Sequence, residues 1–440
     1  PVTMRYSPKS MMKDWRVGAL PGEEFQEVGR DLDEGVQAAK LLVEYGYDAL
    51  DVDVGTYDAW WWNHPPMYQE KGLYRKYAKL MKETVDVPIL MAGRMDNPEM
   101  ASACIADGTC DIISLGRPLL ADPEYVNKLR ANQYDRVRPC LSCHEGCMGR
   151  IQEYSALNCA VNPQACRERD MAYQPICRPK KVLIVGGGVA GCEAARVLAI
   201  RGHEPHLFEA GSQLGGNLIP GGVPDFKEDD HALAAWYARE LEGLSVPVTL
   251  NHKVTASEAM SGGYDAVIVA TGSTPKVFSL GDDARVHTAA DVLTGKADCG
   301  SKVVIVGGGL VGCETALWLA QQGKQVTIVE ALDKLLAVNG PLCHANSEML
   351  EALIPFHQVQ VVTNAKVQRF ENGVLTAQMP EGVHTLEADD VVLCVGYKEE
   401  DSLYKELEFS VSEIYCLGDA RKVANIMYAI WDAFEVANHL

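Results

Sequence analysis

The stretch KVLIVGGGVAGCEAARVLAIRGHEPHLFEA, from Lys181 to Ala210, decides the fold class of the C-terminal part of this 440-residue chain. An apolar run leads into three spaced glycines, a helical pattern follows, and a second apolar run ends at Glu209. A glycine signature alone is weak, but this one stands between a strand and a helix, and an acid follows 18 residues after Gly191. This context predicts a dinucleotide-binding β-α-β unit.

The three glycines of this loop each have a physical role. Gly186 allows a tight turn, Gly188 lets a pyrophosphate approach the backbone, and Gly191 lets the helix pack on the strand. The start of the helix offers unpaired N–H groups to the phosphates. Glu209 is placed to accept a hydrogen bond from a ribose hydroxyl.

The same unit recurs as KVVIVGGGLVGCETALWLAQQGKQVTIVEA, from Lys302 to Ala331, 121 residues further along the chain. The repeat predicts two dinucleotide-binding domains. A carboxylate at the end of the second strand accepts from a 2′-hydroxyl and repels a 2′-phosphate, so a nicotinamide cofactor bound here should be NADH rather than NADPH. The equivalent residues of this second loop are Gly307, Gly309, Gly312 and Glu330.

Two further strand ends, YDAVIVATGSTP (Tyr264–Pro275) and IYCLGDA (Ile414–Ala420), resemble marks of the flavoprotein reductases that contain two dinucleotide-binding domains. In that family the NAD domain is inserted into the FAD domain. The resemblance implies that Gly418 and Asp419 belong to the FAD site, with the aspartate on the ribityl chain. Alone, the aspartate would be an ordinary turn residue.

The first 135 or so residues alternate between short apolar runs and helical patterns, which predicts a parallel α/β sheet. A (β/α)8 barrel needs eight such units in roughly 250 residues, and this segment has about four. It is therefore a small open sheet or part of a barrel, and a start directly on a strand favours the C-terminal half of a barrel. The expected strands are Val2–Arg5, Asp48–Val54, Pro88–Ala92 and Asp111–Leu115, and the expected helices are Val28–Tyr45, Leu73–Thr84 and Pro98–Asp107.

Two of these strands end in a Gly-Arg pair, in MAGRMDNP (Met91–Pro98) and SLGRPLL (Ser114–Leu120). Barrel active sites lie at the carboxyl ends of strands, and the loops after the last two strands often bind phosphate. The phosphate-site candidates are therefore Gly93, Arg94, Gly116 and Arg117. Surface arginines in glycine turns are the alternative.

The stretch CLSCHEGCMGRIQEYSALNC, from Cys140 to Cys159, places four cysteines with two, three and eleven intervening residues. Structural zinc usually shows paired C-x2-C knuckles, whereas three close cysteines and a distant fourth suit an iron–sulfur cubane. Scattered cysteines in a long chain indicate a reducing compartment and disfavour disulfides. Spacing alone leaves iron–sulfur and zinc open. Cys166 and Cys177 lie outside the pattern and are expected to be small core residues.

The order of barrel end, cysteine segment, NPQAC (Asn162–Cys166) and doubled glycine loops resembles one branch of the old yellow enzyme superfamily. The branch includes 2,4-dienoyl-CoA reductase, 2-enoate reductase, the bile-acid-inducible oxidoreductases and trimethylamine dehydrogenase. The resemblance covers essentially the whole chain. It implies FMN in the barrel, with Arg5 beside the flavin ring, and FAD and NADH in the other domains. It also implies a [4Fe–4S] cluster on Cys140, Cys143, Cys147 and Cys159.

The loop GTYDAWWWNHPPMY (Gly55–Tyr68) departs from dienoyl-CoA reductase, which carries a histidine and an acid where this chain has Tyr57 and Asp58. This departure favours the enoate and bile-acid-type members. Tyr57 is the candidate for protonating the substrate or orienting its carbonyl. The tryptophans Trp60–Trp62 either wall the substrate pocket or pack under the barrel rim.

The expected domains are a barrel half at 1–138, a cluster segment at 139–178, an FAD domain at 179–299 and 396–440, and an inserted NAD(H) domain at 300–395. The family's barrel has four earlier βα units, which we do not find here. An unpaired parallel sheet edge should be covered. We therefore expect a fragment, a homo-oligomer or a partner chain that completes the barrel.

Composition and charge exclude some classes of binding partner. The net charge of −20 argues against nucleic acid, which favours a basic face. No apolar run approaches the roughly 20 residues that span a bilayer, and the start of the chain lacks a signal-peptide pattern. A cytoplasmic protein with a small-molecule substrate is expected.

The function that these features indicate is NADH-dependent reduction of the C=C bond of an α,β-unsaturated carbonyl compound, such as an enoate, an enoyl-CoA or a steroid enone. By family resemblance, electrons pass from NADH to FAD, then to the [4Fe–4S] cluster, FMN and substrate. One alternative is an amine dehydrogenase like trimethylamine dehydrogenase. Another is a non-catalytic FAD and iron–sulfur electron-transfer subunit.

Overall fold

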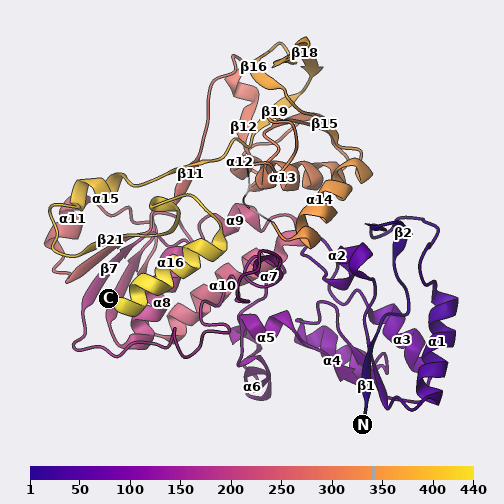
Figure 1. Ribbon diagram of the computed structural model, residues 1–440. Coiled ribbons are helices and arrows are strands. Elements are labelled where there is room, and N and C mark those ends of the chain that lie inside the picture. The colour runs from indigo at the N-terminus through magenta and orange to yellow at the C-terminus, as the bar shows by residue number, and fades with distance from the viewer. Residues whose placement is uncertain (339, 341) are drawn as a thin grey trace. The chain divides into compact units, whose positions relative to one another are not determined.

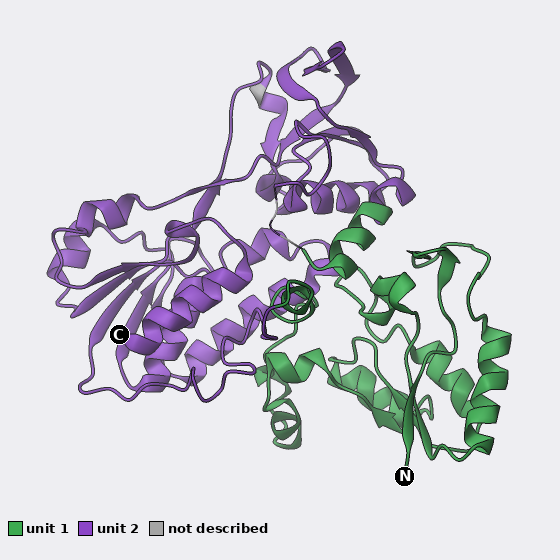
Figure 2. Cartoon of the chain, viewed as in Figure 1, with its two compact units in different colours: residues 1–154, 342–352 green, residues 155–341, 353–440 purple. Residues whose placement is uncertain are grey.

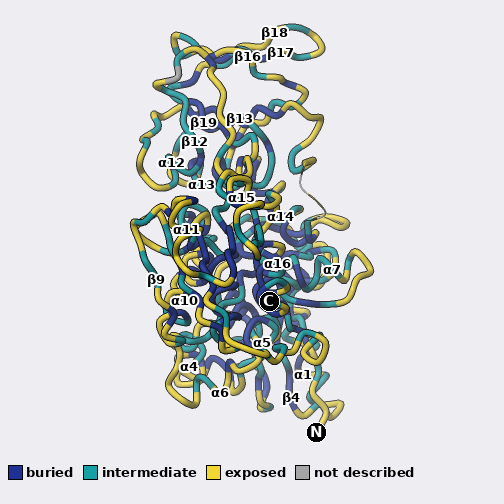
Figure 3. Tube along the Cα trace, turned by 90° about the vertical axis from the view of Figure 1, so that its left-hand side faces the viewer, coloured by how far each residue is buried: buried dark blue, intermediate teal, exposed yellow. Residues whose placement is uncertain are grey.

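A computed structural model describes residues 1–338, 340 and 342–440. The chain forms two compact units, shown in Figure 2. Unit 1 contains residues 1–154 and 342–352, and unit 2 contains residues 155–341 and 353–440. In both units the core residues follow the strands and the helices packed on them, whereas the connecting loops are mostly exposed (Figure 3).

Unit 1 is built on a four-stranded parallel sheet whose spatial order, β1-β4-β5-β6, is also its order along the chain. Helices connect successive strands, as the alternating pattern predicted. The strands are β1 (Thr3–Tyr6), β4 (Ala49–Val52), β5 (Ile89–Met91) and β6 (Ile112–Ile113), and the main helices are α1 (Leu32–Glu44), α3 (Arg75–Thr84) and α4 (Pro98–Ala106).

Local chemistry explains where two of these helices begin. The Asp31 side chain accepts from the Glu34 N–H at 2.9 Å and caps α1, and Asn97 caps α4 in the same way, with Pro98 as its first residue. Helix α1 begins later than the apolar pattern alone suggested, because its cap ends the extended segment before it.

The remaining elements of unit 1 are short and were not predicted. A strand of two or three residues or a helix of one turn is too short to show a period. They are β2 (Met12–Asp14), β3 (Val17–Gly18), η1 (Tyr57–Ala59), α2 (Trp60–Asn63), α5 (Arg117–Ala121), α6 (Tyr125–Arg130), η2 (Tyr134–Arg136) and α7 (Met148–Gln152).

Unit 2 contains a five-stranded parallel sheet in the order β21-β10-β7-β8-β9. Helices α8 and α16 pack closely on each other beside this sheet (Figure 1). The elements are β7 (Lys181–Val185), α8 (Val189–Arg201), β8 (Glu204–Phe208), α9 (Leu218–Gly221), η3 (Asp225–Lys227), α10 (Glu228–Gly243), β9 (Val248–Thr249), α11 (Ala256–Ser261), β10 (Ala266–Val269), α15 (Ser402–Leu407), β21 (Ile414–Cys416), η5 (Gly418–Ala420) and α16 (Ile426–His439).

A second five-stranded parallel sheet, β12-β19-β13-β14-β15, lies between β10 and β21 in the sequence. The second dinucleotide fold is thus nested inside the first, as predicted. The chain leaves the first fold through β11 and returns to it through β20, and these two strands pair antiparallel. A three-stranded antiparallel sheet, β16-β17-β18, lies between β15 and β19 of the second fold in the sequence. The elements are β11 (Ser273–Pro275), η4 (Asp283–Arg285), β12 (Val286–Thr288), α12 (Ala289–Leu293), β13 (Lys302–Val306), α13 (Leu310–Gln321), β14 (Gln325–Val329), α14 (His344–Phe356), β15 (Gln360–Val362), β16 (Lys366–Glu371), β17 (Val374–Met379), β18 (Gly382–Glu387), β19 (Asp390–Leu393) and β20 (Tyr397–Glu399).

The boundaries of the two compact units differ from the domain boundaries expected from the sequence. Residues 342–352, expected in the inserted domain, pack in unit 1, and the cysteine segment is divided at residue 154. The expected boundaries stay predictions. None of the helices in the described residues is long and apolar enough to cross a membrane.

Candidate functional site

The candidate flavin residues of unit 1 meet at one edge of its sheet. Parallel strands place their carboxyl ends on the same side, and Arg5 lies near the end of β1 opposite Asp51 of β4. The Arg5 Nε donates to Asp53 at 2.7 Å, and its Nη1 donates to Asp51 at 2.7 Å. Asp53 is buried and also accepts from Ser7. Two carboxylates therefore fix the guanidinium of Arg5 at the sheet edge.

The two Gly-Arg pairs follow β5 and β6 at this same edge. Gly93 and Arg94 have φ values of 96° and 53°, in the left-handed region that bulky residues avoid. Arg94 is buried and donates to the carbonyls of Met67 and Gln69. The Arg117 Nη1 donates to the Pro65 carbonyl at 2.9 Å.

This edge fits a bound phosphate. Arg5, Arg94 and Arg117 come from the ends of three strands of the same sheet, and a Cβ added at Gly116 would meet no atom within 4 Å. Because Asp51 and Asp53 offset the charge of Arg5, Arg94 and Arg117 supply the positive charge that a flavin phosphate requires beside the open space at Gly116. The assignment of these residues to FMN stays a prediction.

The loop after β4 presents an aromatic stack. Tyr57 is 78% exposed, and its ring lies 5.0 Å from that of Trp60, which stacks on His64 at 4.5 Å. Burial, with repulsion from Arg117 and Arg5, lowers the pKa of His64 to about 4. His64 is therefore neutral at pH 7 and does not protonate a substrate as an imidazolium. Tyr57 keeps an accessible hydroxyl, and its catalytic role stays a prediction.

The neighbouring tryptophans pack under the rim instead of walling a pocket. Trp61 and Trp62 are buried, and both ring N–H groups donate to the Ala19 carbonyl, at 2.9 and 2.6 Å. The sequence left open whether these tryptophans line a pocket or pack under the rim, because a run of three aromatic residues has no periodicity that distinguishes a buried from an exposed position.

Three of the four candidate cluster cysteines, Cys140, Cys143 and Cys147, lie in unit 1, and Cys159 lies in unit 2. The backbone on both sides of Cys143 adopts the left-handed conformation, at Ser142 (φ 50°) and His144 (φ 59°), so the loop turns sharply at this cysteine.

Burial raises the pKa of Cys143 well above its ordinary value, and Glu145 and the thiols of Cys147 and Cys140 raise it further. Burial also raises the pKa of Cys147. Buried thiols whose charges interact would repel one another as anions unless a cationic centre neutralises them. The three thiols of unit 1 therefore fit the role of metal-cluster ligands.

Two cysteine predictions are wrong. Cys166 and Cys177, expected to be small core residues, are both exposed. A lone cysteine carries no periodic signal, so the usual burial of this residue type was the only guide.

A buried chain of hydrogen bonds links the cysteine loop to Arg117 and to α14. The Arg117 Nη1 lies 2.6 Å from His144 Nε2, and His144 Nδ1 lies 2.6 Å from Asn346 Oδ1. Since a guanidinium only donates, Nε2 accepts and Nδ1–H donates to Asn346. Burial and Arg117 lower the pKa of His144 far below its ordinary value, which keeps this ring neutral. Sequence reasoning missed His144 and Asn346, which lie 202 residues apart.

We expect Asn346→Ala to destabilise unit 1 by about 1–3 kcal/mol, because His144 Nδ1–H would lose its acceptor in a buried site. Denaturant unfolding followed by circular dichroism measures the change. Ser347→Ala is the matched control, since the Ser347 hydroxyl donates only within its own helix region, to the Cys343 carbonyl. Equal stability of the two variants would contradict the role of Asn346.

In unit 2 the first glycine loop has the geometry that its sequence predicted. Gly186 has a φ of 108°, and a Cβ at Gly191 would collide with the Gly186 carbonyl oxygen. A Cβ at Gly188 would meet no atom within 4 Å, so space is open where a pyrophosphate should approach. The loop fits a dinucleotide.

Acidic residues surround this loop at the expected positions. Glu209 accepts from the Gly187 N–H at 2.6 Å and from the Gly211 N–H at 2.5 Å. Asp419 accepts from the Ser273 hydroxyl at 2.8 Å, which brings together the two strand ends that resembled flavoprotein reductases. Gly418, with a φ of 57°, sits against Ala190 of α8. Ser273 is a site candidate that the sequence did not single out.

The second glycine loop repeats this arrangement. Gly307 also has a φ of 108°, and a Cβ at Gly312 would collide with the Gly307 carbonyl oxygen. Gly309 directly precedes α13 as its N-cap. Glu330 is 8% exposed and accepts from the Gly308 N–H at 2.6 Å, as Glu209 does in the first loop. This loop also fits a dinucleotide.

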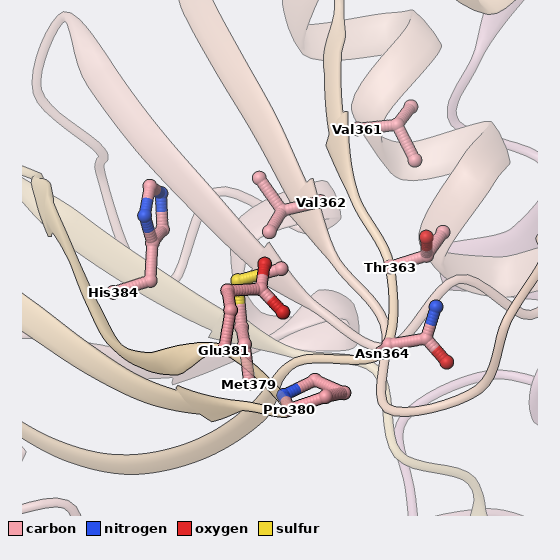
Figure 4. A pocket seen from close by; sticks show the side chains of 8 residues that line it. All are labelled: Val361, Val362, Thr363, Asn364, Met379, Pro380, Glu381 and His384. Carbon is pink, nitrogen blue, oxygen red and sulfur yellow. The ribbon is translucent and has the colours of Figure 1, made fainter.

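An open hollow adjoins the strand beside Glu330. The Glu330 N–H donates to the Val362 carbonyl of β15 at 2.8 Å, and Val362 lines the hollow together with the β17–β18 turn (Figure 4). The lining includes an acid and contains no lysine or arginine among the described residues. The lining residues are Val361, Val362, Thr363, Asn364, Met379, Pro380, Glu381 and His384.

We expect Glu330→Ala combined with Ala331→Arg to lower the NADH/NADPH ratio of kcat/KM by roughly 10- to 100-fold, or about 1.4–2.8 kcal/mol. The change removes the carboxylate that repels a 2′-phosphate and adds a cation at an exposed neighbour. Steady-state kinetics with both coenzymes measures the ratio. Glu209→Ala, the equivalent change in the first loop, should leave it unchanged.

Two family models match this chain. Residues 180–433 match the pyridine nucleotide-disulphide oxidoreductases, and residues 17–136 match the NADH:flavin oxidoreductase / NADH oxidase family. The first match covers more than half of the chain.

Curated relatives match over nearly the whole chain. A cinnamate reductase of Clostridium sporogenes is 52% identical over all of this chain and 66% of its own length, and a bilirubin reductase of Mediterraneibacter gnavus is 34% identical over 94% of this chain and 65% of its own. The chain belongs to the 2-enoate reductase branch of the old yellow enzyme superfamily. This confirms the predicted resemblance. The chain spans about two thirds of the length of these relatives.

A solved structure supports the membership. 2-Naphthoyl-CoA reductase, in complex with 2-naphthoyl-CoA, is 26% identical and superposes with a TM-score of 0.89 over all of this chain and 65% of its own. The predicted fold class, part of a flavin barrel with an iron–sulfur segment and two nested dinucleotide folds, is confirmed. Membership of the 2-enoate reductase branch brings FMN, FAD, NADH and a [4Fe–4S] cluster as cofactors. Their residue assignments stay predictions.

Proposed function

We propose that the protein containing this chain reduces the C=C bond of an α,β-unsaturated carbonyl compound with electrons from NADH. The observation that carries the proposal is the intact second nucleotide loop, with Glu330 hydrogen-bonded beneath it. An amine dehydrogenase that passes electrons to an external acceptor does not need this site. A reductase fed by NADH does.

The substrate class that we propose is an aryl-substituted enoate such as cinnamate. The 52% identical cinnamate reductase supports it. The exposed Tyr57 and the stacked Trp60 and His64 offer an aromatic surface next to the carboxyl edge of the sheet. Enoyl-CoA and steroid enones are the other members of the class.

When bound, NADH, FAD, the iron–sulfur cluster and FMN supply hydride and single-electron transfer. The residues of the chain bind and orient. Arg5, oriented by Asp51 and Asp53, places guanidinium N–H groups at the sheet edge, where they would donate hydrogen bonds to the flavin ring or to a substrate carboxylate. We propose Tyr57 as the group that donates a proton to the α-carbon or orients the carbonyl.

Anaerobic assays test the proposal. We expect NADH oxidation that depends on cinnamate, with one NADH consumed per double bond, and no oxidation with the saturated product 3-phenylpropanoate. Oxidation of trimethylamine with an external acceptor, without reduction of cinnamate, would point to an amine dehydrogenase. Extraction of FAD without FMN would point to an electron-transfer subunit.

We also propose a cytoplasmic protein whose barrel is completed by further strands. Closely placed cysteines such as Cys143 and Cys147 suit a reducing compartment. In the described residues β1 and β6 are the edges of the parallel sheet, and parallel edges need cover. The additional third of the relatives' length, a partner chain or a second copy could supply it. Native mass spectrometry of the holoprotein distinguishes these arrangements.

A further inference from the structure

Three side chains with different metal-binding atoms converge at the edge of the second dinucleotide fold. His287 lies on the edge strand β12, Asp390 begins β19, and Cys299 lies in the turn that precedes β13. One ligand atom from each residue lies within 4.8 Å of the other two. His287 Nε2 lies 3.1 Å from Asp390 Oδ1.

Burial and orientation separate this group from a surface acidic cluster. The His287 and Asp390 side chains are only 17% and 13% exposed, and Cys299 is half-buried. The second oxygen of Asp390 accepts from the Gly300 N–H at 2.7 Å, which orients the carboxylate and leaves Oδ1 facing the histidine. This is how a ligating carboxylate is usually held.

The turn that carries Cys299 is held by hydrogen bonds to its backbone. The Lys324 ammonium donates to the carbonyls of Cys299 and Gly300, at 2.6 and 3.1 Å.

We propose that His287, Cys299 and Asp390 form a zinc site. One nitrogen, one sulfur and one oxygen are the donor types that Zn²⁺ accepts, whereas Mg²⁺ and Ca²⁺ require oxygen ligands. Binding releases the Cys299 proton and forms a thiolate–zinc bond, so the two negative ligands neutralise the ion. Three protein ligands leave the fourth tetrahedral position to water.

The site has a structural consequence. Within the described part of the chain, the edge strand β12 pairs only with β19, over three residues from Val286 to Thr288. A metal that joins β12, β19 and the entry to β13 would clasp this edge. The site lies at the beginning of β13, whereas the glycine loop follows its end, so the clasp is separate from coenzyme binding.

Metal analysis of the full-length holoprotein tests the site. After dialysis against equimolar Zn²⁺, we expect one zinc per chain in the wild type by mass spectrometry of the metal content, in preparations whose iron content is complete. Cys299→Ala and Asp390→Asn should lose most of this zinc. Cys177→Ala, which removes an exposed cysteine, is the matched control and should retain it.

Two further measurements distinguish this site from zinc bound at the cysteine segment or at the surface. X-ray absorption at the zinc edge should show one sulfur neighbour at about 2.3 Å, with nitrogen and oxygen at about 2.0–2.2 Å. Zinc should raise the melting temperature of the wild type but not of Cys299→Ala. Three or four sulfur neighbours, equal zinc in the wild type and Cys299→Ala, or zinc lost with Cys177→Ala would overturn the proposal.

Discussion

Replacing Cys159 with serine is expected to remove the iron–sulfur cluster and to abolish reduction of FMN by NADH, while NADH still reduces FAD. A hydroxyl is a poor ligand for iron compared with a thiolate, and the other three cysteines cannot complete a four-thiolate cluster. Iron should fall from about four atoms per chain to below about one. Stopped-flow spectroscopy under anaerobic conditions follows the two flavins.

The position of Cys159 makes this variant informative. Cys159 lies in unit 2 with both nucleotide loops, and its carbonyl accepts from the Trp431 ring N–H at 3.0 Å. The acceptor in this hydrogen bond is the backbone carbonyl, so the bond survives the substitution and the FAD-binding domain should remain folded. Cys166→Ser, seven residues further on at an exposed position, is the control and should keep iron and both flavin reductions. Normal FMN reduction in iron-free Cys159→Ser protein would contradict a relay through the cluster.

Gly191→Ala is expected to destabilise unit 2 by more than about 3 kcal/mol and to prevent FAD binding, because its Cβ collides with the Gly186 carbonyl oxygen. Backbone cannot move aside as a flexible side chain can. Gly188→Ala should behave differently, since its Cβ meets no atom within 4 Å in the protein itself.

Comparing the two variants distinguishes an effect on folding stability from an effect on FAD binding. Gly188→Ala protein should keep the wild-type unfolding midpoint when flavin-free, yet bind FAD at least roughly 10-fold more weakly, since the methyl group occupies the pyrophosphate's approach. Isothermal titration of the flavin-free protein with FAD gives the affinity, and denaturant unfolding gives the stability. Unchanged FAD affinity in Gly188→Ala would show that the pyrophosphate does not approach this loop.

The sequence by itself determined the two nucleotide folds, because the signals that define them are local. A strand, a glycine turn, a helix and an acid fall within 30 residues, and only glycine tolerates the turn at Gly186 or the contact at Gly191. The alternating strands of unit 1 were predicted for the same reason, whereas the nesting of the second fold was implied by the resemblance to flavoprotein reductases. Caps such as Asp31 shifted the ends of helices without changing the order of elements.

The tertiary structure alone decided which distant side chains meet. No periodicity links His144 to Asn346 or His287 to Asp390, since each pair is separated by more than 100 residues and joined by one hydrogen bond. The burial of Trp61 and Trp62 and the exposure of Cys166 and Cys177 were likewise decided by packing. Local backbone geometry is encoded within a few residues. Contacts between distant side chains depend instead on how the whole chain folds.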